Sequence, residues 1–539
     1  MTESNDTGIE THTEMDTNTK GTMNLKHHSG SADSTGNGRA VCFESLINSG
    51  RISVRRLPVH LTSDYRRVIT RPFLLGPSRV RSLFERIRAI PEDQIDDLLH
   101  EVERAYAHRH PKIGFIFQEN YETGSGLIGW HEKWSPQRRL LAGAYMTMEY
   151  SVDSAALFNP SIVPHPDQSG VEEGGLRFIM SLRATGEGHV SSIAFRTGII
   201  TPDDQVNLDP MPSKLHRSRI APDRHYLKHL VLRKLNEMGI GTNGAIARVA
   251  ETLGEKFTLT QFTQAIESIR TTSNLDPQEQ ESLGHLMWLI QSNFHIDLDP
   301  ESTLQELVIF PMSEEQSNGL EDLRLTRFTD DDGSVTYYGT YTAYNGVRTL
   351  PMMLSTSDFK RIEFASLNGR AVLNKGMALF PRKIQGNYVM CSRIDGENLF
   401  ISRSRSVHFW ETAEKLIAPR HPWELMQIGN CGAPIETDRG WILLTHGVGP
   451  MRTYAIGAML LDLENPLKII GHLRKPLITP DGEDRDGYVP NVVYTCGALE
   501  HRGDLFIPFA MADKSTTFVV IPTMELVNHL LDSPPLEEN

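Results

Sequence analysis

The stretch that decides how this chain is interpreted is Asn318–Arg324, which reads NGLEDLR and leads into strand-like sequence. The turn Asp330–Gly333 divides that sequence, so the pattern predicts a β-hairpin with two adjacent carboxylates at its mouth. Because successive side chains of a strand face opposite ways, we expect Glu321 and Asp322 to have separate roles. One would face a cavity beside the arginine, and the other would stabilise the fold. A carboxyl group next to a guanidinium suits acid catalysis at a glycosidic bond, although charged residues at a hairpin edge are usually only solvated.

Six further motifs follow this stretch in chain order. They are Ser355–Phe359, Asn374–Ile384, Gln427–Ile435, Thr445–Gly447, Gly457–Leu463 and Val489–Gly497. Together with Leu320–Arg324, this series resembles the mannoside phosphorylases of glycoside hydrolase family 130. Proteins of that family are five-bladed β-propellers that cleave β-mannosides with inorganic phosphate. The resemblance covers residues 150–220 and 300–525, and an ordered series of motifs is far more specific than any one of them.

The composition is that of an ordinary globular protein, with 539 residues of which 39% are hydrophobic and 23% charged. Lys and Arg number 54 against 68 Asp and Glu, and a net charge of −14 argues against a nucleic-acid partner. The sequence has no apolar run near the ~18 residues that span a bilayer, and its N-terminus has no hydrophobic signal core. We therefore expect a cytoplasmic protein without membrane contacts.

The four cysteines, Cys42, Cys391, Cys431 and Cys496, have neither CxxC nor metal-like spacing. This pattern predicts reduced, mostly buried thiols. The sequence predicts neither a catalytic metal nor an organic cofactor, and inorganic phosphate would be a co-substrate.

The chain divides unevenly. Residues 1–45 are polar and predict a disordered tail, and apolar residues at helical spacing predict a helical extension over 46–135. Residues 136–530 would form the catalytic domain, followed by a C-terminal tail over 531–539. Longer members of the family carry a similar extension that is often used for oligomer contacts, so the resemblance implies a homo-oligomer formed through it.

A helical insertion is predicted at about 225–297, where the strand pattern stops. Its best helix start is Asp276–Glu279, with an N-cap aspartate, a proline at the first helical position and a glutamate that can close a capping box. A second helix fits Leu259–Ile269.

Outside that insertion, short strands alternate with turns and no crossover helices, which predicts an all-β core in a sandwich, barrel or propeller. Periodicity does not choose among these three architectures. The family resemblance selects the five-bladed β-propeller, with its site at the central funnel.

The chemistry leaves two reactions open. An inverting hydrolase needs a carboxylic acid for the leaving oxygen and a carboxylate base that activates water. A phosphorylase needs the acid but no base, and it requires cationic and amide donors that hold phosphate in line with the sugar.

The resemblance implies that Asp322 is the general acid, acting through the sugar 3-hydroxyl. It implies phosphate-binding roles for Asn374, Arg348, Lys375 and Arg393. It implies sugar-binding roles for Asn159, Arg183, Arg324, His446 and Asp513. Ser392 departs from the family pattern, because short phosphorylases usually have a histidine there, and serine donates a hydrogen bond but carries no charge.

We therefore expect transfer of a terminal β-mannosyl residue from an oligosaccharide to phosphate, with inversion, giving α-mannose 1-phosphate and a shortened acceptor. One alternative is an inverting β-mannosidase that uses water, with Glu436 or Glu483 as base. The other is a non-catalytic propeller that binds carbohydrate.

Overall fold

The computed structural model of the protein describes residues 52–534, except 111, 213, 219–224, 238–239, 243, 313–315, 345 and 347–348. The predicted disordered tail and its Cys42 lie outside the described residues, as do residues 535–539 of the predicted C-terminal tail. Arg348, predicted to bind phosphate, lies outside them as well.

The core strands form five groups of mainly antiparallel strands that follow one another along the chain. The first two groups consist of β4 (Ala156–Pro164), β5 (Leu176–Thr185), β6 (Ser191–Ile200) and β7 (Val206–Leu208), and of β13 (Gly319–Thr329), β14 (Val335–Tyr344), β15 (Thr349–Thr356) and β16 (Arg361–Ser366). They are joined by a bridge between Gly319 and Ser191, and their edges carry β8 (His216–Arg217), β11 (Phe294–Asp297) and β12 (Leu307–Ile309).

The remaining three groups are separate sheets. They consist of β17 (Ala378–Leu379), β18 (Tyr388–Ser392), β19 (Leu399–Ser404) and β20 (Ala413–Ile417); of β21 (Gln427–Asn430), β22 (Ile435–Thr437), β23 (Gly440–Val448), β24 (Tyr454–Leu461) and β25 (Ile469–His472); and of β26 (Val493–Tyr494), β27 (Leu499–His501), β28 (Asp504–Met511), β29 (Ser515–Pro522) and β1 (Arg55–Leu61). The predicted all-β core is confirmed.

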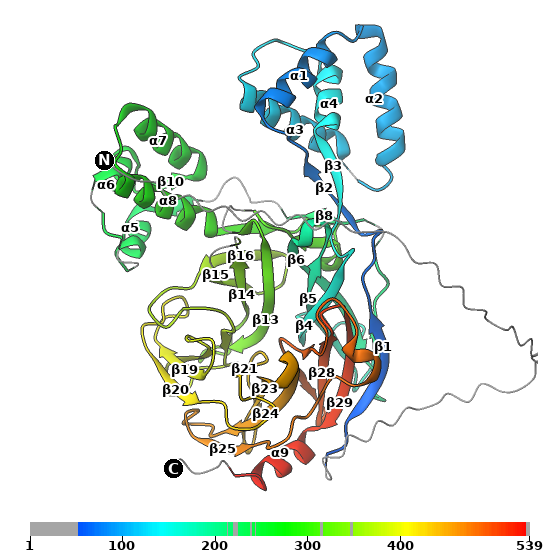
Figure 1. The fold of residues 1–539 in the computed structure, drawn as a ribbon, viewed down its shortest axis with the longest axis vertical. Helices are drawn as coiled ribbons and strands as arrows, with labels where there is room; N and C mark the ends of the chain where they lie inside the picture. Colours follow the sequence, from blue (N-terminus) through cyan, green and yellow to red (C-terminus); the bar gives the residue numbers. More distant parts are fainter. Residues whose placement is uncertain are drawn as a thin grey trace, which may run out of the picture. The chain divides into compact units, whose positions relative to one another are not determined.

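The five groups contact one another in a cycle. Strand β4 of the first group contacts β13 of the second, and β13 and β14 contact β17 of the third. Strands β18 and β19 then contact β21, and β24 contacts β26. The cycle closes because β28 and β29 of the last group contact β4 of the first. Figure 1 shows the groups succeeding one another in chain order around a common centre.

The packing of β23 shows how neighbouring groups bury their faces. Every residue of this strand is buried, and alternate side chains belong to different hydrophobic clusters. Ile442 and Leu444 pack in one cluster with Ile507 of β28, whereas Trp441 and Leu443 pack in another with residues of β18 and β19. Because side chains alternate across a strand, this sheet is covered on both faces by its neighbours, which explains its nearly unbroken apolar sequence.

Strand β1 completes the last sheet by pairing antiparallel with β29, with Arg55 opposite Val520 and Leu57 opposite Phe518. This segment lies in the predicted helical extension, and neither β1 nor β2 (Val68–Pro72), which pairs with β3 (Thr147–Ser151), is predicted by the sequence pattern. Leu57 is the only buried residue of β1, so the strand has little hydrophobic pattern of its own. Its partner, β29, lies at the opposite end of the chain, so no local sequence pattern can predict their pairing.

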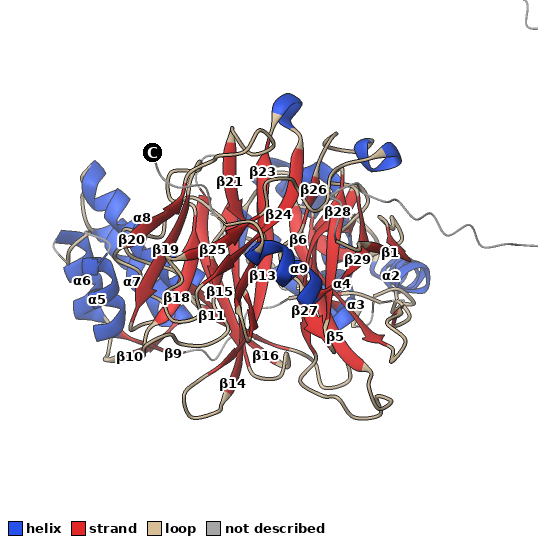
Figure 2. Cartoon of the chain, turned by 90° about the horizontal axis from the view of Figure 1, so that it is seen from below, coloured by secondary structure: helices blue, strands red, loops and turns tan. Residues whose placement is uncertain are grey.

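The helices form two groups, each with its own apolar core, and one terminal helix, α9 (Thr523–Leu531), that packs against β24 and β25. The first group consists of α1 (Pro77–Arg88), α2 (Glu92–Tyr106), α3 (Ile113–Ile128) and α4 (Pro136–Tyr145). The second consists of α5 (Lys228–Glu237), α6 (Gly244–Thr252), α7 (Leu259–Thr272) and α8 (Pro277–Ser292), together with the short strands β9 (His225–Leu227) and β10 (Lys256–Thr258). Figure 2 shows the helices in blue outside the strands. Among the described helices, none is long and apolar enough to cross a membrane.

Replacing Asp276 by Ala should lower the free energy of unfolding of the α5–α8 group by about 1 kcal/mol. The predicted capping box is confirmed: the Asp276 carboxylate accepts a bond of 2.7 Å from the Glu279 amide, and the Glu279 carboxylate accepts from the Asp276 amide. Hydrogen exchange of the first turn of α8 and urea unfolding measure the loss. The matched control is Gln278→Ala at an exposed position of the same turn. Equal protection in the two variants would contradict the prediction.

Candidate active site

The two carboxylates of the Leu320–Arg324 motif lie on a bulge of β13. The register between β13 and β14 shifts between Glu321 and Arg324, and Asp322 has a φ of 56°. Both carboxylates consequently turn toward Arg183 of β5, which lies 2.8 Å from Glu321 Oε1 and 3.6 Å from Asp322 Oδ1. The expectation that they point to opposite faces is wrong, because strand alternation fails at a bulge with a left-handed residue.

A second irregular strand faces this bulge. In β4 the register with β5 shifts after Phe158, and Asn159 has a φ of 49°. The Asn159 amide Nδ2 donates a hydrogen bond of 2.7 Å to Asp322 Oδ1.

Left-handed backbone is uncommon for residues other than glycine and costs of order 1–3 kcal/mol, so it concentrates at functional sites. Four of the predicted site residues adopt it: Asn159, Asp322, Asn374 and Asp513.

Cations surround the Asp322 carboxylate. Arg324, only 2% exposed, donates to the backbone carbonyl of Asp322 at 3.1 Å and to the hydroxyl of Tyr494 at 2.8 Å. Lys375 lies 3.0 Å from Glu321 Oε2, so Glu321 bridges Lys375 and Arg183. Burial would raise the pKa of Asp322, but Arg183 and Arg324, the Asn159 bond and Lys375 outweigh it and lower the pKa below its ordinary value.

Asp513 has the opposite electrostatic environment. It lies at the turn between β28 and β29 with a φ of 50°, and it interacts electrostatically with Arg183, Asp322 and Glu321. Burial, together with the nearby charge of Asp322, raises the pKa of Asp513 to about 6 against the opposing effect of Arg183. The site thus contains one carboxyl group with a lowered pKa and one with a raised pKa. In enzymes, such a difference assigns the ionised role to the first group and the proton-carrying role to the second.

Arg393 and His446 form the other side of the site. Arg393 Nη1 lies 2.9 Å from Nε2 of the buried His446, and the side-chain amide of Gln427 lies 3.2 Å from the same nitrogen. Burial, Arg393 and Arg324 hold the pKa of His446 well below its ordinary value, so the neutral ring accepts from Arg393. The His446 ring centroid is 5.0 Å from that of Tyr494, which links this pair to Arg324.

Two residues predicted to bind sugar are almost fully buried. Arg324 and His446 are 2% and 1% exposed. Their side chains contact Asp322 and Arg393.

The loop before β17 brings the remaining predicted residues close to Arg393. Gly376, next to Lys375, would place a Cβ atom 3.7 Å from the Cβ of Arg393. Asn374 packs against the turn that follows Arg393, because a Cβ on Gly396 would lie 2.8 Å from Asn374 Nδ2. Asn374, Lys375 and Arg393 therefore lie close together, as a shared phosphate-binding site would require.

Three residues of the site were not predicted from the sequence: Glu321 as a partner of Lys375, Tyr494, and Gln427. All three belong to motifs that were recognised, so the signal was present, but their contacts arise only in three dimensions. With them, the cluster contains four cations, Arg183, Arg324, Lys375 and Arg393. Its carboxyl groups are Glu321, Asp322 and Asp513. The excess of positive charge favours an anionic ligand.

Known proteins match the part of the chain that carries most of this cluster. The sequence model described as beta-1,4-mannooligosaccharide phosphorylase, of glycoside hydrolase family 130, matches residues 293–532. A 1,2-beta-oligomannan phosphorylase of Thermoanaerobacter sp. (strain X514) is 32% identical over 215 residues, which cover 39% of this chain and 70% of the relative. The chain belongs to glycoside hydrolase family 130.

Two further similar proteins are named as mannoside phosphorylases. A beta-1,4-mannooligosaccharide phosphorylase of Ruminococcus albus is 27% identical over 44% of this chain and 74% of its own length. The crystal structure of a beta-1,2-mannobiose phosphorylase from Listeria innocua aligns with a TM-score of 0.43 at 20% identity, covering 71% of this chain and 93% of the other. The family match contains Asp322, Lys375, Arg393, His446 and Asp513. Asn159 and Arg183, which come from β4 and β5, precede it.

Proposed function

We propose that this family 130 protein is a mannoside phosphorylase. It transfers the terminal β-mannosyl residue of a short oligosaccharide to inorganic phosphate with inversion, giving α-mannose 1-phosphate and a shortened acceptor. The excess of cations over ionised carboxylates around Asp322 carries this proposal, because a dianionic nucleophile needs such a cluster and water does not. The names of three similar proteins, which are mannoside or mannooligosaccharide phosphorylases, support the same reaction class.

The five-bladed β-propeller is the architecture that best accounts for the site. Five strand groups contact one another in a closed cycle, as blades do around an axis. Every group supplies part of the site. The contributions are Arg183 from β5, Asp322 from β13, Arg393 after β18, His446 from β23 and Asp513 beside β28. Residues from five strand groups can meet only where those groups converge, which in a propeller is the central funnel.

In the proposed mechanism Asp322 supplies the proton and phosphate supplies the nucleophilic oxygen. Asp322 has a lowered pKa in the free protein, so it must gain a proton when the complex forms. A phosphate held by Lys375 and Arg393 adds negative charge beside Asp322 and opposes the cations that lower its pKa. Asp513, with its pKa of about 6, is a neighbouring carboxyl group that can still carry a proton.

The hydrolase alternative needs a free carboxylate base, and Glu436 does not fit that role well. The Arg382 guanidinium lies 2.7 and 2.9 Å from Glu436 Oε1 and 3.1 Å from Oε2, so this carboxylate is committed to an ion pair. The side chain of Glu483 lies outside the described residues. Ser392, the departure from the family pattern, is fully buried in β18, so its hydroxyl is not open to an entering anion.

Incubation with β-1,2- and β-1,4-linked mannobioses, with and without phosphate, tests the proposal. A phosphorylase consumes the sugars only with phosphate and releases α-mannose 1-phosphate. Turnover that is independent of phosphate would identify the hydrolase, and binding without turnover would identify the non-catalytic propeller.

Replacing Lys375 by Ala should raise the KM for phosphate by about ten- to a hundredfold. The reason is that a charge-assisted hydrogen bond contributes roughly 1.5–3 kcal/mol and each tenfold change equals 1.4 kcal/mol. Initial rates across a phosphate titration measure the effect, and mannoside binding without phosphate should change little. Lys383→Ala is the matched control, because Lys383 belongs to the same motif but pairs with Asp330 at the far end of the β13–β14 hairpin. An unchanged KM in Lys375→Ala would remove this residue from the phosphate site.

A further inference from the structure

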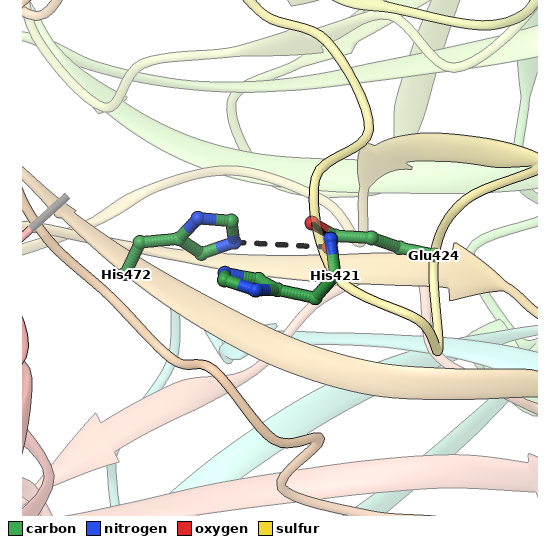
Figure 3. A group of neighbouring side chains, drawn as sticks. All are labelled: His421, Glu424 and His472. Carbon is green, nitrogen blue, oxygen red and sulfur yellow. Dashed lines mark hydrogen bonds and ion pairs between the residues drawn. The ribbon is translucent and has the colours of Figure 1, made fainter. Parts of the chain in front are cut away.

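A second cluster of chemically capable side chains lies apart from the residues discussed above. His421 and Glu424 lie in the turn between β20 and β21, and His472 is the last residue of β25 in the same sheet as β21. One nitrogen from each histidine and one oxygen from Glu424 lie within 4.8 Å of one another. Figure 3 shows the three side chains converging on one another from these two segments.

All three side chains are removed from solvent, with exposures of 6% for His421, 0% for Glu424 and 2% for His472. Glu424 Oε1 is held in place, because it accepts from the backbone amides of Arg420 at 3.2 Å and His421 at 3.1 Å. Glu424 Oε2 and His472 Nε2 have no hydrogen-bond partner among the residues that the structure describes. The dashed line in Figure 3 marks the contact between them, and its length of 3.7 Å exceeds that of a hydrogen bond.

Leaving these atoms unpartnered is costly. A buried acceptor without a hydrogen bond loses the hydration that it has in the unfolded chain, and the loss is larger when the acceptor carries charge. Glu424 Oε2 and His472 Nε2 are buried, lack a hydrogen bond among the described residues and face one another next to a second imidazole. A cation between them would explain this arrangement.

We propose that His421, Glu424 and His472 bind a divalent transition-metal ion, with zinc as the best match. Two imidazole nitrogens and one carboxylate oxygen form a ligand set that zinc accepts at about 2.0–2.2 Å, and hard ions such as magnesium prefer oxygen alone. Ligand atoms around tetrahedral zinc lie roughly 3.4 Å apart, so separations within the 4.8 Å limit must shorten by at most about 1.4 Å, which side-chain torsions can supply.

One further observation fits this assignment. Leu425 and Met426, which follow Glu424, are 62% and 71% exposed, so the turn reaches the surface and an ion can approach it.

The ion would have a structural role. It would tie the β20–β21 turn to β25, and the backbone amide of Gln427 already bonds to the Glu424 carbonyl at 2.9 Å. Gln427 in turn contacts His446, so the metal would stabilise the sheet that supports one side of the active site.

Metal binding to the purified full-length protein tests the proposal without any reference to mannoside turnover. After treatment with a chelator, the protein is titrated with Zn²⁺ and with Co²⁺, and bound metal is counted by elemental analysis. The wild type should bind one equivalent more than His472→Asn or Glu424→Gln, and the Co²⁺ form should show visible absorption typical of low coordination. Zinc should also raise the Tm of the wild type and not of these variants. His165→Asn, which changes a histidine elsewhere in the chain, should behave as the wild type.

Equal metal content in the wild type and both variants would overturn the proposal and identify the cluster as a metal-free histidine–carboxylate contact. If His472→Asn does not fold, His421→Asn replaces it, and the wild-type titration still decides. The proposal is also overturned if the chelator-treated wild type binds no equivalent of zinc or cobalt and its Tm does not change when either metal is added. Loss of phosphorolysis alone, with metal binding intact, would concern the proposed function and not this site.

Discussion

Replacing Asp322 by Asn should lower kcat by about 10²–10⁴-fold, the usual contribution of a general acid, while the protein stays folded and still binds mannoside. Asparagine has nearly the shape of aspartate and can keep the contact with Asn159, but it cannot deliver a proton. Steady-state rates at saturating phosphate, together with Tm and sugar binding, measure the effect.

Asp331→Asn is the matched control, because Asp331 lies on the same β13–β14 hairpin with its side chain 72% exposed at the opposite end. Near wild-type turnover in Asp322→Asn would end the assignment of the acid. The bulge also changes what we expect of Glu321. Since Glu321 bridges Arg183 and Lys375, Glu321→Gln should disturb phosphate affinity as well as stability, contrary to an outward-facing structural role.

Replacing Asp513 by Asn should make the protein more stable at pH 8 than the wild type while reducing its activity. The folded-state pKa of Asp513 is about 6, above the ordinary 3.8, so the folded protein binds this proton more tightly than the unfolded chain does. The resulting stability is fully present below pH 3.8 and is lost as pH rises through about 6. Asparagine stays neutral, so it escapes that loss.

The size of this effect follows from the shift. A pKa of about 6 in place of 3.8 corresponds to about 3 kcal/mol, and partial solvent exposure of Asp513 reduces this free energy to about 1–3 kcal/mol. Tm measured between pH 4 and 8 should therefore fall less steeply for Asp513→Asn than for the wild type. Asp438→Asn, an exposed change in the β22–β23 turn, serves as control. Parallel pH profiles for wild type and Asp513→Asn would show that Asp513 has an ordinary pKa.

Local patterns in the sequence were sufficient for local structure. The turn Asp330–Gly333 predicted the β13–β14 hairpin, which forms with Thr329 opposite Val335. The capping box at Asp276–Glu279 and the helix from Leu259 are confirmed, because their stabilising bonds join residues only a few positions apart. The three described cysteines are free and buried, as their spacing predicted.

The sequence by itself determined the all-β core, the family and the chemical types of residue at the site, since propensity, turn chemistry and ordered motifs are local properties of the chain. Only the tertiary structure decided which side of β13 Glu321 and Asp322 face, because a single left-handed residue reverses the strand alternation on which the prediction rested. It also decided that Arg324 and His446 are buried, that β1 pairs with β29, and that His421 and Glu424 meet His472. Each of these outcomes depends on segments distant in sequence that are brought together when the sheets pack, and no local pattern records the free energy of that packing.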